Sequence, residues 1–113
     1  MEPARVLVIA PNSDMRRSIA FALEAEGFVV TSHPGVLGGD AARGYDAVVL
    51  DHKAAKGERE PIVSLCQRTP VILLAGSPQP WLVGHVSRVV ETPVAGETLT
   101  MAVRWQLQQS HHH

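Results

Sequence analysis

The sequence predicts an α/β protein in which five parallel strands form one sheet with helices on both faces. Short apolar runs rich in β-branched residues recur along the chain, each of strand length and each followed by a turn-forming residue. Segments with apolar residues at helical spacing lie between several of these runs. Because parallel strands are joined by right-handed crossovers, this alternation predicts a doubly wound sheet.

The bulk composition predicts one packed domain. The chain has 113 residues, of which 45 % are hydrophobic and 19 % charged. We interpret residues 111–113, all histidine, as purification-tag residues, which leaves residues 1–110 as the domain. A formal net charge of -1 without a basic block argues against binding to nucleic acid. The apolar runs are too short to cross a membrane and no secretory signal is present, so we expect a cytoplasmic protein without membrane contact.

The predicted elements follow one another with short turns. Strands are expected at 5–10, 28–32, 47–51, 70–75 and 88–91, and helices at 14–26, 61–68 and 97–109. Ser13 is predicted to cap the first helix and Gly27 to end it. Prolines and glycines make residues 34–44 and 76–87 poor helix material, so the second and fourth helices are expected to be short or irregular.

Parallel sheets collect their chemistry at the carboxyl ends of their strands. The third predicted strand ends in an acid, Asp51, whereas the first ends in Ala10-Pro11-Asn12. One acid without acidic neighbours suggests a site that lacks part of its machinery. Elsewhere, three scattered histidines show no metal-ligand spacing, and the single Cys66 is predicted to be a buried apolar residue.

Residues 6–17, Val-Leu-Val-Ile-Ala-Pro-Asn-Ser-Asp-Met-Arg-Arg, together with Asp51 and Pro93, give the chain a likeness to a known family. It resembles the receiver domain of two-component response regulators over nearly all of its native residues. The resemblance implies a flavodoxin-like (βα)5 fold. In that family the first strand ends in an acidic pair that holds Mg²⁺, the third in a phosphoaccepting aspartate, the fourth in Thr or Ser, and the fifth in Lys-Pro.

The chain departs from the family pattern at most of these positions. Asp51 matches the phosphoacceptor and Pro93 the proline, and the resemblance implies a cis bond before Pro93. The departures are Ala10 and Pro11 at the acidic pair, Ala75 at the hydroxyl position, Thr92 at the lysine, and Val89 at the switching aromatic. The pattern therefore resembles a degenerate, or pseudo-receiver, form.

These departures remove the charges on which phosphoryl transfer depends. Transfer to a carboxylate concentrates negative charge that a divalent cation and a lysine normally offset. Ala10, Pro11 and Thr92 supply neither, so we expect no bound Mg²⁺, no cofactor and no catalysis.

Three further side chains are candidates for the same pocket. Lys53 could place its ammonium over Asp51 as a substitute cation, or be an ordinary solvated lysine. Asn12 and Ser77 could form hydrogen bonds near Asp51, or serve as turn and cap residues.

A cluster of large side chains is the candidate interface. It comprises Trp81, Leu82, Val89, Met101 and Trp105, near the face that receiver domains use for dimers and partners. Exposed, these side chains would favour association, and buried, they would complete the core.

The leading hypothesis is a phosphorylation-independent interaction or regulatory module in a two-component-type pathway. Its partner would be a histidine kinase, an output domain, another regulator or a second copy. The alternative is a working receiver phosphorylated on Asp51 by a histidine kinase through a non-standard pocket, with Lys53 as the cation. A nucleotide binder or flavodoxin-like enzyme is disfavoured because no Gly-rich phosphate loop follows the first strand. The polar end of the last helix slightly favours an N-terminal piece of a longer protein over a stand-alone chain.

Overall fold

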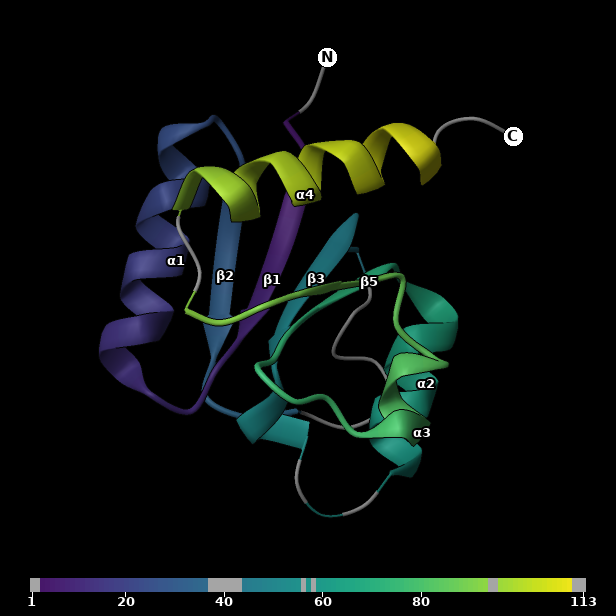
Figure 1. The fold of residues 1–113 in the computed structure, drawn as a ribbon. Helices are drawn as coiled ribbons and strands as arrows, with labels where there is room; N and C mark the ends of the chain where they lie inside the picture. The colour runs from purple at the N-terminus through teal and green to yellow at the C-terminus, as the bar shows by residue number, and fades with distance from the viewer. Residues whose placement is uncertain (1–2, 37–43, 56, 58, 94–95, 111–113) are drawn as a thin grey trace.

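A computed structural model describes residues 3–36, 44–55, 57, 59–93 and 96–110. Five parallel strands form one sheet in the order β2-β1-β3-β4-β5 (Figure 1). The elements are β1 (Arg5–Ile9), α1 (Ser13–Ala25), β2 (Val29–His33), β3 (Ala47–Asp51), the 3₁₀ turn η1 (His52–Ala55), α2 (Glu60–Arg68), β4 (Val71–Leu74), α3 (Pro80–Val83), β5 (Arg88–Val90) and α4 (Gly96–Ser110). The predicted doubly wound parallel sheet is confirmed.

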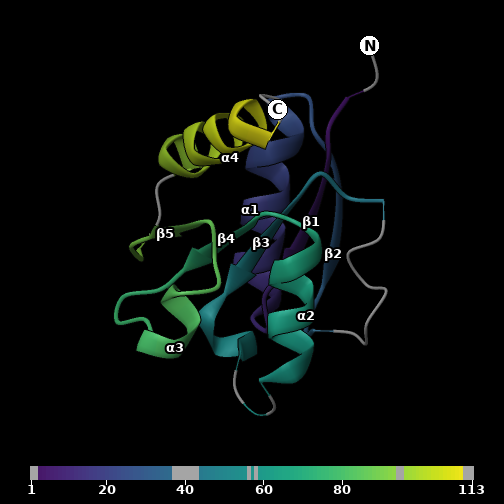
Figure 2. The same cartoon turned by 90° about the vertical axis from the view of Figure 1, so that its right-hand side faces the viewer.

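Helices cover both faces of the sheet and enclose two apolar cores. α1 and α4 lie on one face, and α2 and α3 lie on the other (Figure 2). Alternate residues of β1 serve the two cores, because successive side chains of a strand point to opposite faces: Val6 and Val8 face α1 and α4, whereas Leu7 and Ile9 face α2 and α3. Every residue of β3 is buried, as expected for an interior strand covered on both sides.

The first helix begins one residue earlier than predicted, and its cap is Asn12 instead of Ser13. Asn12 has an extended backbone, and its Oδ1 accepts a hydrogen bond of 2.9 Å from the Met15 N–H. Both residue types cap helices well, so composition alone does not choose between neighbours. Gly27 follows the helix with φ of +96°, a left-handed conformation that favours glycine, so the predicted stop is confirmed.

The fourth crossover is short, as predicted, since α3 has only four residues. The second crossover falls largely on residues 37–43, which lie outside the described residues. The peptide bond between Thr92 and Pro93 is cis, which confirms what the family resemblance implied. None of the helices in the described ranges is long and apolar enough to cross a membrane.

Cys66 is only half-buried, contrary to the expectation of a core residue. Ile62 and Leu65 occupy the side of α2 that faces the sheet, which leaves Cys66 at the edge of the core. Burial still raises the pKa of the Cys66 thiol to about 11, so the thiol is protonated at neutral pH.

Candidate functional site

The strand register brings the candidate pocket residues to one edge of the sheet. Ile9 pairs with Leu50 and Asp51 with Leu74, so Ala10 follows β1 beside Asp51 and Ala75 follows β4 on the other side. A Cβ placed on Gly76 would lie 3.4 Å from the Thr92 Oγ1, which puts Thr92 at the same edge. The residues that replace the acidic pair, the hydroxyl and the lysine therefore surround the end of β3.

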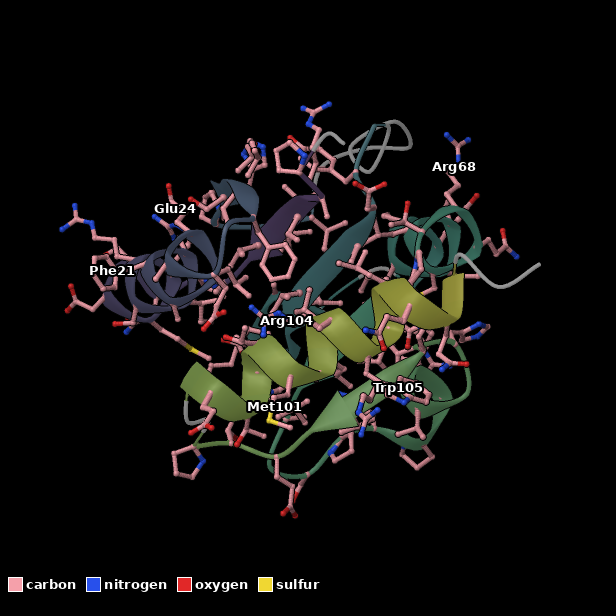
Figure 3. The ribbon with its side chains drawn as sticks, turned by 90° about the horizontal axis from the view of Figure 1, so that it is seen from above. Phe21, Glu24, Arg68, Met101, Arg104 and Trp105 are labelled. Carbon is pink, nitrogen blue, oxygen red and sulfur yellow. The ribbon has the colours of Figure 1, made fainter. Side chains whose placement is uncertain are left out.

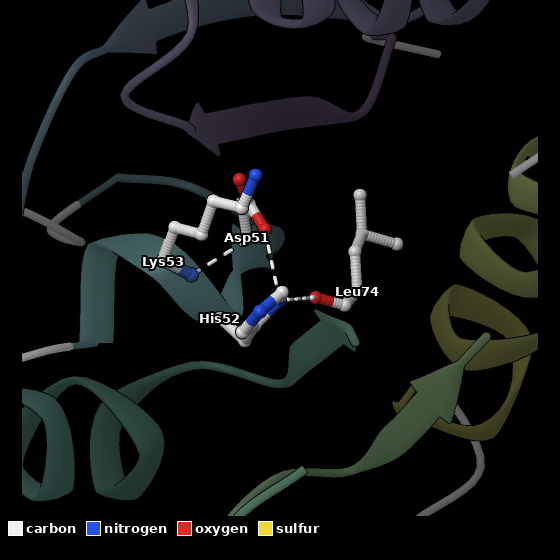
Figure 4. A network of polar contacts seen from close by, with 4 residues as sticks. All are labelled: Asp51, His52, Lys53 and Leu74. Atoms are coloured by element: carbon white, nitrogen blue, oxygen red, sulfur yellow. Dashed lines mark hydrogen bonds and ion pairs between the residues drawn. The ribbon is translucent and has the colours of Figure 1, made fainter. Parts of the chain in front are cut away.

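Asp51 is a buried carboxylate with few partners (Figure 4). Its side chain is 2 % exposed, and Ala10 and Ala75, which directly follow the neighbouring strands, are fully buried. Its Oδ1 accepts a long hydrogen bond of 3.4 Å from the Lys53 main-chain N–H. Its Oδ2 is buried and has no hydrogen-bond partner among the described residues. Burial of an unpaired acceptor is unfavourable, so Asp51 lowers the free energy of unfolding compared with an apolar side chain at the same position.

The imidazole of His52 is the main group that contacts this carboxylate. Its Nδ1 lies 3.2 Å from the Asp51 Oδ1 and 3.2 Å from the Leu74 carbonyl oxygen (Figure 4). The Leu74 carbonyl oxygen is an acceptor, so the hydrogen bond to it requires the proton on Nδ1, and the same nitrogen lies at ion-pair distance from the Asp51 carboxylate. The ring thus lies at the end of β4, beside Ala75, which occupies the hydroxyl position of the family. It contacts the last residue of β3 and the last residue of β4, and we call this pair of contacts the His52 bridge.

The other predicted pocket residues take different places. Lys53 contacts Asp51 through its main-chain N–H, and within the described part of the chain its ammonium makes no ion pair with that carboxylate. The Asn12 side chain is engaged as the α1 cap and is not directed at Asp51. Ser77 lines a small cavity of about 60 Å³ together with His52 and Gln79, so it lies next to the imidazole.

The donor set at this edge does not fit Mg²⁺. A hard divalent cation prefers several oxygen ligands, usually including more than one carboxylate, and among the described residues Asp51 is the only acid that directly ends β1, β3 or β4. The Ala10 carbonyl oxygen accepts a hydrogen bond of 2.8 Å from the Arg16 guanidinium, and the Pro11 carbonyl accepts a longer one of 3.4 Å. A positive charge therefore lies beside the main chain of the two residues that replace the acidic pair. Among the described residues, no group of three or more His, Cys, Asp or Glu side chains is arranged to hold a metal ion.

The outer face of α4 is exposed and apolar. Met101 is 63 % exposed and Trp105 47 % exposed, so neither belongs to the core (Figure 3). The Arg88 guanidinium stacks over the Trp105 ring at 4.8 Å, which holds the indole against β5. A groove runs between β5 and α4, and its lining includes Val89, Glu91 and Thr98. We call the surface formed by Arg88, Glu91, Met101 and Trp105 the α4 face.

Two of the residues predicted for the interface lie elsewhere. Leu82 is 2 % exposed and packs in the core beneath α3, so its assignment to a contact surface is wrong. α3 lies on the opposite side of the sheet from α4, and Trp81 there packs against Arg59 and His85. Val89 is partly buried against the same core. The right-handed crossover from β4 to β5 puts α3 on this face once the strand order is known, and the order comes from the structure.

The fold has close structural counterparts. A response regulator receiver domain protein from Clostridium thermocellum matches with a TM-score of 0.79 at 21 % identity, covering 95 % of this chain and 96 % of that one. The chain has the fold of response-regulator receiver domains. A receiver domain protein from Methanospirillum hungatei JF-1 matches with a TM-score of 0.81 at 18 % identity, covering 96 % of each chain.

A third counterpart is the signal receiver domain of an HD domain-containing protein from Pseudomonas fluorescens Pf-5. Its TM-score is 0.79 at 16 % identity, and the match covers 99 % of this chain and 100 % of that one. No protein-family model matches the sequence, and no curated protein matches it either. The likeness to receiver domains is therefore one of fold.

Sequence reasoning missed His52 and Arg16 as residues of this edge. His52 directly follows the conspicuous aspartate, and Arg16 lies one helical turn after the cap Asn12. One signal was available in the sequence. Ala10 and Ala75, which flank Asp51, have no polar side-chain groups, and a buried carboxylate needs a hydrogen-bond donor from a nearby residue.

Proposed function

We propose that this chain is a phosphorylation-independent interaction module of a two-component-type pathway in the cytoplasm. It binds a protein partner, such as a kinase, an output domain or another regulator, without any chemical step at Asp51. The fold supports the pathway class by likeness to receiver domains. The residues around Asp51 lack the groups that phosphoryl transfer normally uses, which supports a function without that step.

The single observation that carries this proposal is the bridge made by His52. In a phosphorylation-driven switch, phosphate biases an equilibrium between two conformations. Here a side chain of the protein itself links the Asp51 carboxylate to the end of β4, at 3.2 Å from each acceptor. The bridge favours one arrangement of the strand ends without phosphate. The α4 face is the surface that we expect this fixed arrangement to present to a partner.

One observation favours the alternative of a functional phosphoacceptor. The Asp51 Oδ2 is retained, buried and unpaired within the described part of the chain, so one oxygen is still available as a nucleophile. Any such reaction would proceed without the usual metal and lysine, and the His52 bridge would have to open. The two functions differ in whether the pocket responds to a phosphoryl mimic.

The test is an amide correlation NMR spectrum of ¹⁵N-labelled protein before and after addition of Mg²⁺ and then beryllofluoride. We expect amide resonances of Asp51, Lys53 and Ala75 to stay in place, because the acidic pair that would hold Mg²⁺ and the lysine that would contact the added group are replaced in this chain. The Asp51→Asn variant, treated identically, controls for ionic-strength effects. Saturable shifts in the wild type that disappear in this variant would contradict the proposal and establish a phosphoacceptor.

The α4 face is tested by Trp105→Ala. Because Trp105 is half-exposed, its removal is expected to change the free energy of unfolding by less than about 1 kcal/mol, since large losses come from core and buried polar sites. Binding to a partner at this face should weaken by at least about 2 kcal/mol, as is typical of a central aromatic. Urea unfolding and pull-down of radiolabelled partner candidates measure the two effects. Val83→Ala, at an exposed apolar position on the other side of the sheet, is the matched control. A large stability loss would place Trp105 in the core and contradict the assignment.

A further inference from the structure

The outer face of α1 carries an exposed aromatic side chain that the proposed function does not use. Phe21 is 77 % exposed, the largest value among the large hydrophobic side chains in the described ranges. Ile19 and Leu23 anchor α1 to the core, and Phe21, two residues from each, points about 200° around the helix from them. In Figure 3, Phe21 and Glu24 lie on the side of α1 that faces away from α4. A single exposed hydrophobic side chain is common on protein surfaces, so Phe21 indicates a contact only through the residues that surround it.

Two opposite charges flank Phe21 on the same exposed face. Arg17 lies one turn before it and Glu24 lies about one turn after it, and both are exposed. The two charges are seven positions apart on the helix, a rise of about 10 Å, so they do not pair with each other. Within the part of the chain that the structure describes, neither makes an ion pair with another residue. By contrast, Glu26 on the same helix pairs with Arg104 of α4.

The order of these charges is self-complementary under twofold symmetry. The midpoint between Arg17 and Glu24 lies between residues 20 and 21, next to Phe21. A second copy of α1, running antiparallel about this point, would bring its glutamate opposite the arginine of the first, and the reverse pair would form on the other half. A twofold axis imposes this reciprocity on any isologous contact. The exposed Ser18 and Ala25 are small, which lets the two helices approach closely on the other side of Phe21.

We propose that α1 is a self-association surface, on which Phe21 packs against the same residue of a second copy and Arg17 pairs with Glu24 across the twofold axis. The occupant is a second copy because the charge pattern complements itself. This surface is separate from the α4 face, so the inference does not depend on the proposed function. A contact limited to one helix per copy falls at the small end of protein interfaces, and a weak, reversible dimer is expected.

Charge reversal on the helix surface tests this arrangement without disturbing the core. Sedimentation velocity over a concentration series should show a monomer–dimer equilibrium for the wild type. Arg17→Glu alone and Glu24→Arg alone each place like charges opposite one another twice, and each should weaken the dimer by about tenfold. The double variant Arg17→Glu/Glu24→Arg restores both pairs and should regain wild-type association.

A mixture of the two single variants gives the sharpest result. One chain then carries two acidic groups and the other two basic groups, so the mixed dimer should form more readily than either single-variant dimer. Phe21→Ala should weaken association, whereas Val83→Ala, at an exposed apolar position on the other face of the sheet, should leave it unchanged. A monomeric wild type at all concentrations, or a double variant no better than the singles, would overturn the proposal. Dimerisation lost through Trp105→Ala but not through Phe21→Ala would overturn it too, and would assign self-association to the α4 face.

Discussion

Restoring the acidic pair and the lysine together, with Ala10→Asp, Pro11→Asp and Thr92→Lys, is expected to create Mg²⁺ binding at the edge that holds Asp51. The register places residue 10 beside Asp51, so the new carboxylates would lie next to the existing one. A unit charge about 4 Å from a cation contributes roughly 4 kcal/mol at an effective dielectric constant of about 20, before desolvation is subtracted. We therefore expect Mg²⁺ affinity to rise by at least about tenfold over the wild type. Mg²⁺ titration followed by amide NMR measures this change.

The His52 bridge makes this rebuilding experiment more informative. With His52 in place, the imidazole competes for the Asp51 Oδ1 at 3.2 Å. Adding His52→Ala to the rebuilt protein should strengthen the response to beryllofluoride, whereas His52→Ala alone should give no response. The double variant Pro11→Asp/Thr92→Lys places no charge at the fully buried Ala10. It replaces the triple variant in this experiment if the triple variant unfolds. Equal responses with and without His52 would show that the imidazole does not obstruct the site.

The sheet was predictable because its signals are local. The sequence of β3 is a short apolar run that ends in an acid. Such a run is typical of a strand that is buried on both faces, where polar and apolar residues do not alternate. The cap and stop of α1 were predicted to within one residue for the same reason, since each depends on a single residue and its own backbone. The juxtaposition of Ala10 and Asp51 then follows from parallel pairing alone.

The contacts at the strand ends were not predictable because they depend on side-chain directions after the strands end. Nothing in the letters Asp51-His52-Lys53 indicates that the imidazole turns back to the Leu74 carbonyl while the lysine contributes only its main chain. Leu82 was misplaced for a related reason. An apolar residue in a four-residue helix has no periodic pattern by which its buried side can be recognised, and the structure turns it into the core.

Replacement of the buried acid, Asp51→Ala, is expected to increase the free energy of unfolding by about 1 kcal/mol or more. A buried polar atom without a partner costs roughly 1–3 kcal/mol, and the Asp51 Oδ2 is such an atom within the described residues. Aspartate is also disfavoured in strands, so its removal from β3 carries no penalty in propensity. The substitution loses the 3.4 Å contact from Lys53, which is long for a hydrogen bond. It also leaves His52 with the Leu74 carbonyl as its acceptor. The stabilising terms are therefore the larger ones.

Asp46→Ala provides the matched control, because it removes a carboxylate that is satisfied. Asp46 Oδ2 accepts a hydrogen bond of 2.8 Å from the Arg5 main-chain N–H, and its loss should lower the free energy of unfolding by about 1 kcal/mol. Urea unfolding at neutral pH, with equal slopes for both variants and the wild type, measures the two changes on one scale. Opposite signs would show that Asp51 lowers stability, so its role would be the contact with His52 that fixes the strand ends, which needs no chemical step at the carboxylate. If Asp51→Ala proves as destabilising as Asp46→Ala, the His52 bridge outweighs the unpaired oxygen, and Asp51 is a structural residue of the β3–β4 junction.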